Sequence, residues 1–305
     1  MKKFVISIIS GFALAALFLA SCSQASTSSQ GSLNILASTT FLADIAQNVA
    51  GHRAQVTSLV PVGADPHEYQ TAPSDVTKIT ASNVLILNGV EYEHFIKPLL
   101  DNAGGQRLVI TASDGLEARM MPDETNTGQL AGDPHMWLDP NRVVRYVENI
   151  RDGLIKSDPH GADVYKTNAE AYIAQLKVLD AWIMAQVKII PVEHRLLVTN
   201  HDAMGYFADR YGFTIIATVI PSVSTDASTS AKQLAEVIDQ IKSSGAPAIF
   251  LGEVENPNLA NQIAAETGAK VINDLHLESL TDGPPAGTYL DMMKYNVTQI
   301  VDALK

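Results

Sequence analysis

The feature that most constrains this chain is an alternation of short β-rich apolar runs with longer helix-forming stretches, repeated from residue 33 to the C-terminus. Such an alternation favours parallel sheets covered by helices over an all-β or an all-α design. The predicted strands fall into two sets, one in each half of the body: Leu33–Ala37, Gln55–Val60, Val84–Leu87 and Leu108–Ile110, then Leu196–Thr199, Phe213–Ile216, Ala248–Leu251 and Lys270–Ile272. We therefore expect an α/β fold with two lobes, each a mainly parallel sheet flanked by helices.

One long helix is expected between the two sets of strands. Helix formers without Gly or Pro run from Ala162 to Ile190, and apolar residues recur there every three or four positions on one face. The members of this stripe are Tyr165, Ala169, Tyr172, Leu176, Leu179 and Ile183. At 1.5 Å per residue such a helix would be roughly 40 Å long, enough to act as a rigid spine for both lobes. Two ordinary helices broken near Asp180 are the alternative.

The domain boundaries follow from this arrangement. We expect an N-terminal α/β lobe over residues 33–158, a linking helix over 159–191 and a C-terminal α/β lobe over 192–305. Within the first lobe, one helix is predicted over Thr40–Ala50, with Gly51 at its stop position.

The N-terminus has the pattern of an export signal. Two lysines precede an apolar run from Phe4 to Ala20, and small residues lead up to Cys22, the single cysteine of the chain. The residues before Cys22 resemble the bacterial lipoprotein processing box, in which the cysteine is acylated and becomes the mature N-terminus. We therefore expect a signal peptide over residues 1–21, lipid attachment at Cys22 and a flexible tether over 22–32. A transmembrane anchor is the alternative, although about 17 apolar residues barely span a bilayer.

Composition excludes several classes of protein. A hydrophobic fraction of 46% excludes a disordered chain, and one cysteine excludes both a disulfide framework and a zinc site built on thiolates. The 21 basic residues against 33 acidic ones give a net charge of −12. An acidic surface disfavours nucleic acid as a partner and favours the attraction of cations.

Three of the eight histidines occur in distinctive local sequences. The tripeptide Asp-Pro-His occurs twice and ends in His67 and His135, where proline makes a stiff, non-helical turn. His201 follows the apolar strand Leu196–Thr199, at a switch from strand to helix. Three imidazoles that converge from two lobes would form most of a tetrahedral zinc site. Unrelated turn and capping roles for the three are the alternative.

Several motifs together resemble a known family. The runs are Asn34–Thr40, Gly63–Tyr69, Asn88-Gly89, Gly132–Pro140, Thr199–Ala203, Tyr206-Phe207, Tyr211-Gly212 and Thr288-Tyr289 with Met292, Met293 and Asn296. They resemble, in the same order, the metal-binding lipoproteins that serve bacterial zinc and manganese ABC importers. The resemblance covers the chain from about residue 33 to its C-terminus.

The resemblance implies a ligand set. The ligands would be His67, His135, His201 and one carboxylate on a loop after the last strand. Glu278 fits the local pattern best, although the family usually has Asp there. Alternative fourth ligands are Asp274, His276 and Asp282.

Further acidic residues are expected close to the metal without binding it. A metal-bound histidine usually donates its second ring N–H to a carboxylate or a carbonyl. Asp65, Asp133 and Glu253 are the candidates, and for Asp65 and Asp133 the alternative is turn stabilisation alone.

Zinc is the expected metal, because three imidazoles and one carboxylate suit zinc better than manganese. The absence of a His-rich segment over residues 119–131 speaks for the alternative, a manganese or iron receptor of the same type. A lipoprotein adhesin is a further alternative. A secreted zinc hydrolase is a distant one, because a fourth protein ligand closes the sphere that a catalytic zinc keeps open.

The resemblance also implies the partners and the location. We expect a monomeric receptor that is not an enzyme, does not bind nucleic acid and is anchored through acylated Cys22. It would lie on the periplasmic or outer face of the plasma membrane and pass one ion to the membrane subunits of an ABC permease.

Overall fold

The computed structural model describes residues 33–122, 129–252 and 254–305. The predicted signal peptide, the tether and the lipid attachment at Cys22 lie outside these residues.

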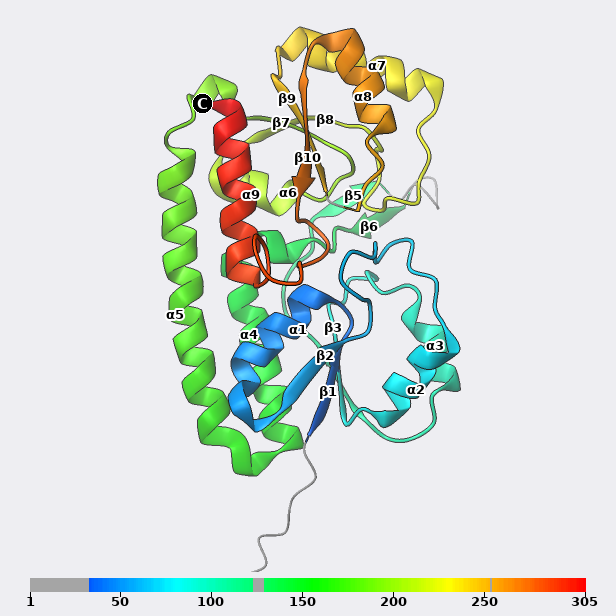
Figure 1. The fold of residues 1–305 in the computed structure, drawn as a ribbon, viewed down its shortest axis with the longest axis vertical. Coiled ribbons are helices and arrows are strands. Elements are labelled where there is room, and N and C mark those ends of the chain that lie inside the picture. The colour runs from blue at the N-terminus through cyan, green and yellow to red at the C-terminus, as the bar shows by residue number, and fades with distance from the viewer. Residues whose placement is uncertain (1–32, 123–128, 253) are drawn as a thin grey trace, which may run out of the picture. The chain divides into compact units, whose positions relative to one another are not determined.

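Two parallel sheets carry the fold (Figure 1). The first has the strand order β2-β1-β3-β4 and the second the order β10-β9-β7-β8. Their strands are β1 Asn34–Ala37, β2 Gln55–Ser58, β3 Val84–Leu87, β4 Leu108–Thr111, β7 Leu196–Thr199, β8 Thr214–Thr218, β9 Ala248–Gly252 and β10 Lys270–Leu275. The predicted strands therefore all form, and the predicted fold class is confirmed.

The α-helices cover both faces of these sheets. They are α1 Thr40–Ala50, α2 Pro73–Ala81, α3 Ile96–Asn102, α4 Pro140–Ser157, α5 Ala162–Val187, α6 Gly205–Tyr211, α7 Ala231–Ser244, α8 Asn258–Thr267 and α9 Tyr289–Leu304. Helix α1 begins and ends where the sequence predicts, and Gly51 adopts the positive φ of 59° that ends it.

The alternation of side chains along the first sheet separates two cores. Ile35 and Ala37 of β1 face α1, α4 and α5, whereas Leu36 between them packs with Ile79 of α2 and Leu99 of α3. Both faces are covered, which explains why Ile35–Ala37 of β1 and all of β3, the two central strands, are apolar.

The second sheet is built on the same principle. Val198 and Ile249 pack against α7 and α8, while Leu197 and Phe250 face the opposite side. The core around Leu197 and Phe250 is continuous with the one that contains Ile35 of the first sheet.

Helix α5 joins the two halves of this continuous core. It runs along one side of the molecule past both sheets (Figure 1), and its predicted apolar stripe from Tyr165 to Ile183 is buried. The helix is uninterrupted at Asp180, so the alternative of two shorter helices is wrong. Residues 33–305 form one compact unit, and the lobe boundaries at residues 158 and 191 stay predictions.

One element was not predicted from the sequence. Strands β5 Met120–Pro122 and β6 Leu130–Gly132 form an antiparallel pair that leads directly into the second Asp-Pro-His turn.

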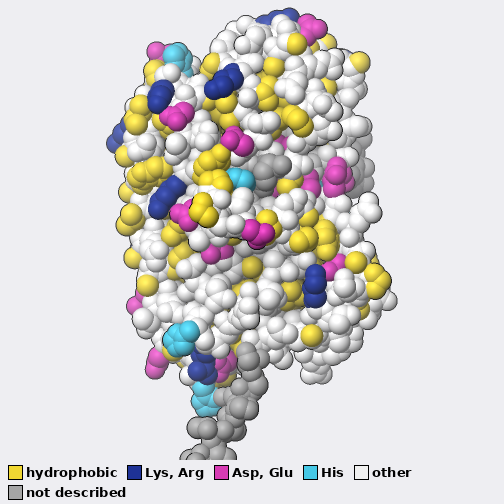
Figure 2. Space-filling model, in the orientation of Figure 1, with side chains coloured by type: hydrophobic (Ala, Val, Ile, Leu, Met, Phe, Trp, Pro, Cys, Tyr) yellow, Lys and Arg dark blue, Asp and Glu magenta, His cyan; other side chains and the backbone are white. Residues whose placement is uncertain are grey.

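The surface is mixed in charge. On the face shown in Figure 2, Lys and Arg side chains are scattered among acidic and uncharged ones instead of gathering in one basic area. Within the described ranges, no helix combines the length and the hydropathy that a membrane crossing requires.

Candidate metal site

His67 is presented by a turn that follows β2. The carboxylate of Asp65 accepts the backbone N–H of His67 at 2.8 Å, and its other oxygen accepts the hydroxyl of Thr225 at 2.7 Å. Asp65 therefore shapes the turn and ties it to the second half of the chain. This matches the alternative role of turn stabilisation.

His135 follows β6 in the second turn of this kind. One oxygen of the buried Asp133 accepts both the backbone N–H and the ring Nδ1–H of His135, each at 2.9 Å. A proton held on Nδ1 leaves the lone pair of Nε2 free for a metal. Asp133 therefore fixes both the turn and the imidazole.

His201 lies just beyond the end of β7. Its Nδ1 is 2.6 Å from an oxygen of Glu255, whose other oxygen accepts the N–H of Gly252 at the end of β9. Glu255 was not predicted, and Glu253, which was, lies outside the described residues. The signal was present in the sequence, because both glutamates follow the same apolar strand two positions apart.

Glu278 lies on the loop after β10. Its Oε2 accepts a hydrogen bond of 2.5 Å from the hydroxyl of Tyr92. Its Oε1 is buried and has no hydrogen-bond partner among the described residues. Tyr92, whose ring contacts His67 edge-on at a centroid distance of 5.1 Å, was also missed by the sequence analysis.

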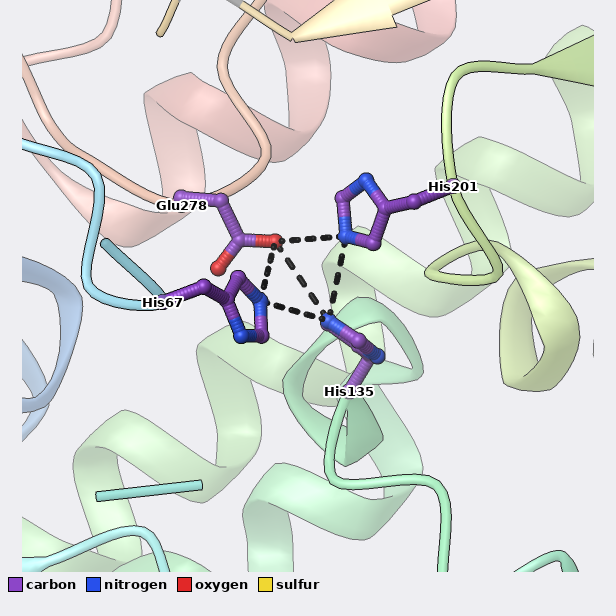
Figure 3. Close-up of side chains that lie close together, drawn as sticks. All are labelled: His67, His135, His201 and Glu278. Carbon is purple, nitrogen blue, oxygen red and sulfur yellow. Dashed lines mark hydrogen bonds and ion pairs between the residues drawn. The ribbon is translucent and has the colours of Figure 1, made fainter. Parts of the chain in front are cut away.

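Figure 3 shows how the four side chains converge on one point. Nε2 of His135 lies 3.4 Å from Nε2 of His67 and 3.3 Å from Nε2 of His201. Oε1 of Glu278 lies 3.9, 3.5 and 3.4 Å from the Nε2 atoms of His67, His135 and His201. In a tetrahedron with metal bonds of about 2.0–2.1 Å, ligand atoms are about 3.3–3.4 Å apart. The site is thus close to the size that a four-coordinate ion requires.

Two of the imidazoles are more basic than an ordinary histidine. Burial disfavours a charged ring at His201, but the hydrogen bond to Glu255 and the negative charge of the nearby Glu278 outweigh burial and raise the pKa of His201 to about 10. The pKa of His135 is also raised in spite of its burial, because Asp133 and Glu278 lie beside it. A positive charge is therefore favoured at the centre of the site, and either a proton or a metal ion can provide that charge.

The other two groups have the protonation states that a metal site needs. Burial is the main cause that lowers the pKa of His67, and the rings of His135 and His201 lower it further. Burial alone would raise the pKa of Glu278, but the three imidazoles hold it well below its usual range. At neutral pH His67 is therefore neutral and Glu278 is ionised, which are the forms of these side chains that can bind a metal.

The alternative fourth ligands do not reach this point. Asp274 is exposed and accepts the hydroxyl of Tyr295 at 2.7 Å. His276 is bonded through its backbone to the side chain of Asn296, and its ring lies against Tyr295. Asp282 is exposed.

The chain matches the model of a family described as the periplasmic component A of the zinc-uptake complex, over residues 35–303. The manganese-binding lipoprotein MntA of Halalkalibacterium halodurans is 35% identical over 308 residues, which cover 100% of this chain and 99% of that protein. The iron-binding protein YfeA of Yersinia pestis is 31% identical over 264 residues, with 86% of this chain and 83% of that protein covered.

Two solved structures are also similar. The periplasmic zinc-binding protein TroA of Treponema pallidum has a TM-score of 0.81 at 27% identity and covers 90% of this chain and 99% of its own. A manganese-bound periplasmic metal-binding protein of Candidatus Liberibacter asiaticus has a TM-score of 0.79 at 28% identity, with 90% and 100% covered.

Proposed function

We propose that this chain, which belongs to the family of the periplasmic component A of the zinc-uptake complex, captures single zinc ions and delivers them to a membrane permease. The family resemblance inferred from the motifs is confirmed by the model match and by the relative that covers the whole chain. The chain is therefore a metal-binding receptor of an ABC importer in the bacterial cell envelope and not an enzyme. The hydrolase considered as a distant alternative is set aside.

The proposed ligands are Nε2 of His67, His135 and His201 and Oε1 of Glu278. One observation carries this assignment: Oε1 is buried, lacks a hydrogen-bond donor within the described part of the chain, and faces the three Nε2 atoms. A buried carboxylate oxygen without a partner is costly, and a cation bound between it and the imidazoles removes that cost.

Zinc is favoured by the donor set and by its spacing. Three nitrogens and one oxygen at roughly tetrahedral distances suit zinc, whereas manganese prefers more oxygen ligands. A divalent ion bound to one carboxylate keeps one positive charge. Asp133 and Glu255, each in contact with Nδ1 of a ligand histidine, are placed to offset that charge.

Manganese is the second candidate. The relative that is 35% identical is named as manganese-binding, and a solved structure of similar fold holds manganese. A further relative is named for iron. A nitrogen-rich site binds zinc tightly in vitro whatever the cell loads, so the physiological metal has to be measured in cells.

The remaining parts of the proposal concern how the receptor is held and used. Acylation of Cys22 would anchor it to the membrane, and the segment 22–32 would allow it to reach the permease as a monomer. Mass spectrometry of the membrane fraction tests the first point, because a diacylated N-terminal cysteine has a distinct mass.

Removal of single ligands tests the site. We expect one tightly held ion per chain in the wild type and loss of that ion in His67→Ala, His135→Ala and His201→Ala alike, measured by elemental analysis of the purified protein. His194→Ala is the matched control, because His194 is exposed. Full stoichiometry in any two of the three ligand variants would contradict the assignment.

The fourth ligand and the metal need separate experiments. Glu278→Gln should weaken binding strongly, whereas Asp274→Asn should not, and the opposite result would move the ligand to Asp274. Expression with zinc, manganese and iron all limiting, followed by elemental analysis, identifies the metal that the cell loads.

A further inference from the structure

We propose that Tyr92 determines metal selectivity by holding one oxygen of Glu278, so that this carboxylate forms a single bond to the metal and the ion stays four-coordinate. The inference rests on the proposed function, because it takes Glu278 as a ligand. Tyr92 is a positioning residue here, since it acts on the ligand and does not touch the ion.

The two oxygens of Glu278 have different environments. Oε2 accepts the hydroxyl of Tyr92 at 2.5 Å, whereas Oε1 has no hydrogen-bond donor in the described ranges. Figure 3 shows dashed lines from one oxygen of Glu278 to all three imidazoles and none from the other oxygen. A hydrogen bond to an ionised carboxylate is short and about twice as strong as a neutral one. Rotation of Oε2 toward the ion would break this bond.

The position of Tyr92 is itself firmly set. It ends a turn in which Gly89, Val90 and Glu91 all have positive φ, at 91°, 56° and 57°. A β-branched residue adopts this conformation only where the surrounding structure imposes it. The buried carboxylate of Glu93 imposes it here, because it accepts the backbone N–H groups that begin the turn, including that of Gly89 at 3.2 Å.

Aromatic packing fixes the ring of Tyr92. The ring is 2% exposed, lies edge-on to Trp137 at a centroid distance of 5.0 Å and is tilted against Phe41 at 6.5 Å. This packing directs the hydroxyl at Glu278, and the packing of the ring does not depend on the hydrogen bond between the two. A phenylalanine in this place would keep the ring and lose only the hydrogen bond.

The loop that carries Glu278 is anchored on both sides of the carboxylate. The indole N–H of Trp137 donates to the carbonyl of Leu277 at 2.9 Å. The backbone N–H of Leu280 donates to the hydroxyl of Thr40 at 2.8 Å. The backbone of the loop therefore cannot turn the carboxylate freely, and Tyr92 controls its remaining freedom.

The expected consequence is a bias between metals. Zinc is satisfied by four ligands, whereas manganese takes more oxygen ligands and prefers higher coordination. A carboxylate that forms only one metal–oxygen bond completes the four-coordinate sphere of zinc. The same carboxylate supplies no additional oxygen ligand for manganese. A carboxylate that can use both oxygens would supply that fifth ligand without any change in the rest of the site.

Tyr92→Phe in the full chain tests this role. We expect the ratio of manganese affinity to zinc affinity to rise roughly tenfold, the scale of one hydrogen bond to a charged group. The affinities are measured by competition with a chromophoric chelator, and X-ray absorption of the bound ion should show one additional oxygen neighbour. Tyr165→Phe is the matched control, because its hydroxyl also donates to a carboxylate, that of Asp158, at 2.8 Å.

Two results would overturn the proposal. One is an equal loss of both affinities with the coordination number unchanged, which indicates a purely structural role. The other needs no variant: a wild-type zinc complex in which X-ray absorption finds five ligands, two of them from one carboxylate. Failure of the proposed function differs from both, because the wild type then holds no ion.

Discussion

At the scale of single residues, two of the imidazoles, those of His135 and His201, are held through the ring nitrogen that faces away from the centre. Asp133 and Glu255 each bind an Nδ1, so the lone pair on Nε2 is directed inward. The same carboxylates make these rings strong bases. Before a metal enters, a proton therefore occupies the position that the metal will take.

Replacement of Glu255 by Gln should change how zinc binding depends on pH. The raised pKa of His201, about 10 in the wild type, keeps the ring protonated at neutral pH, so a metal ion that binds this ring must displace a proton. Affinity in the wild type should then rise with pH by about tenfold per unit above pH 7. Without the Glu255 carboxylate the pKa of His201 falls, and fewer protons are released on binding.

Calorimetry in two buffers of different ionisation enthalpy measures this proton release. The control is Glu236→Gln, which removes an exposed carboxylate on α7. Equal proton release in the wild type and in Glu255→Gln would contradict the role given to Glu255.

The sequence predicted which four side chains converge better than it predicted the groups that hold them. The Asp-Pro-His turns place their histidines through local backbone geometry, so two neighbours in sequence are enough to recognise them. Tyr92 is 186 residues from Glu278 in sequence, and a hydrogen bond of that kind leaves no local pattern. The contact of Glu255 with His201 depends on the path of the loop after β9, which the residue types do not determine.

At the scale of elements, α5 also depends on a contact between residues that are distant in sequence. Asp180 is a poor helix former in mid-helix, which made a break there a reasonable alternative. In the structure its carboxylate accepts two hydrogen bonds from Arg210, at 3.0 and 2.7 Å, and a third from Tyr211 at 3.0 Å. The partner that keeps the helix continuous lies on α6, so tertiary contact decides the question and not helix propensity.

Helix α1 and helix α9 are tied by a buried carboxylate, and this tie should make stability depend on pH. Asp44 of α1 accepts the backbone N–H of Tyr289 at the start of α9. Burial raises the pKa of Asp44 to about 6, against the lowering effect of that hydrogen bond. Because the folded state binds the proton more tightly, this group contributes stability below its unfolded pKa of about 3.9 and loses it as pH rises through 6.

Asp44→Asn should therefore gain about 1.5 kcal/mol of stability relative to the wild type between pH 5 and pH 8, which is half of the effect of the whole pKa shift. The amide oxygen can still accept the N–H of Tyr289, so the tie itself is kept. Urea unfolding of the metal-free protein at the two pH values measures the difference, with the exposed Asp239→Asn as control. A difference between variant and wild type that is the same at both pH values would show that Asp44 does not titrate in this range.

At the scale of the whole molecule, the ligands are divided unequally between the two halves. His67 and His135 belong to the first half, and Glu278 comes from the second half in sequence. However, Tyr92, Trp137 and Thr40 bind the Glu278 loop to the first half. His201, just after β7, is left as the ligand that the second sheet holds through Glu255.

This division has a consequence for release. The continuous core along α5 resists large rotation of the two halves, because rotation would expose apolar surface on both. If the four side chains bind the ion as proposed, a small separation at the site would first remove His201 from the ion and leave the other three ligands together. The sequence could not predict this, since it assigns the Glu278 loop to the C-terminal lobe by position alone.

Removing one anchor of the loop that carries Glu278 should speed the loss of metal. Thr40→Val removes the oxygen that accepts the N–H of Leu280, and that N–H lies in a largely buried segment. We expect the dissociation rate of zinc, followed by transfer to an excess of chelator, to rise roughly tenfold, the scale of one lost hydrogen bond with its partner left unsatisfied. Thr298→Val is the control, because Thr298 is exposed on α9 and its hydroxyl bonds only within that helix, to the carbonyl of Lys294 among the described residues. An unchanged rate in Thr40→Val would contradict the role of this bond and would mean that the other contacts of the loop hold Glu278 without it.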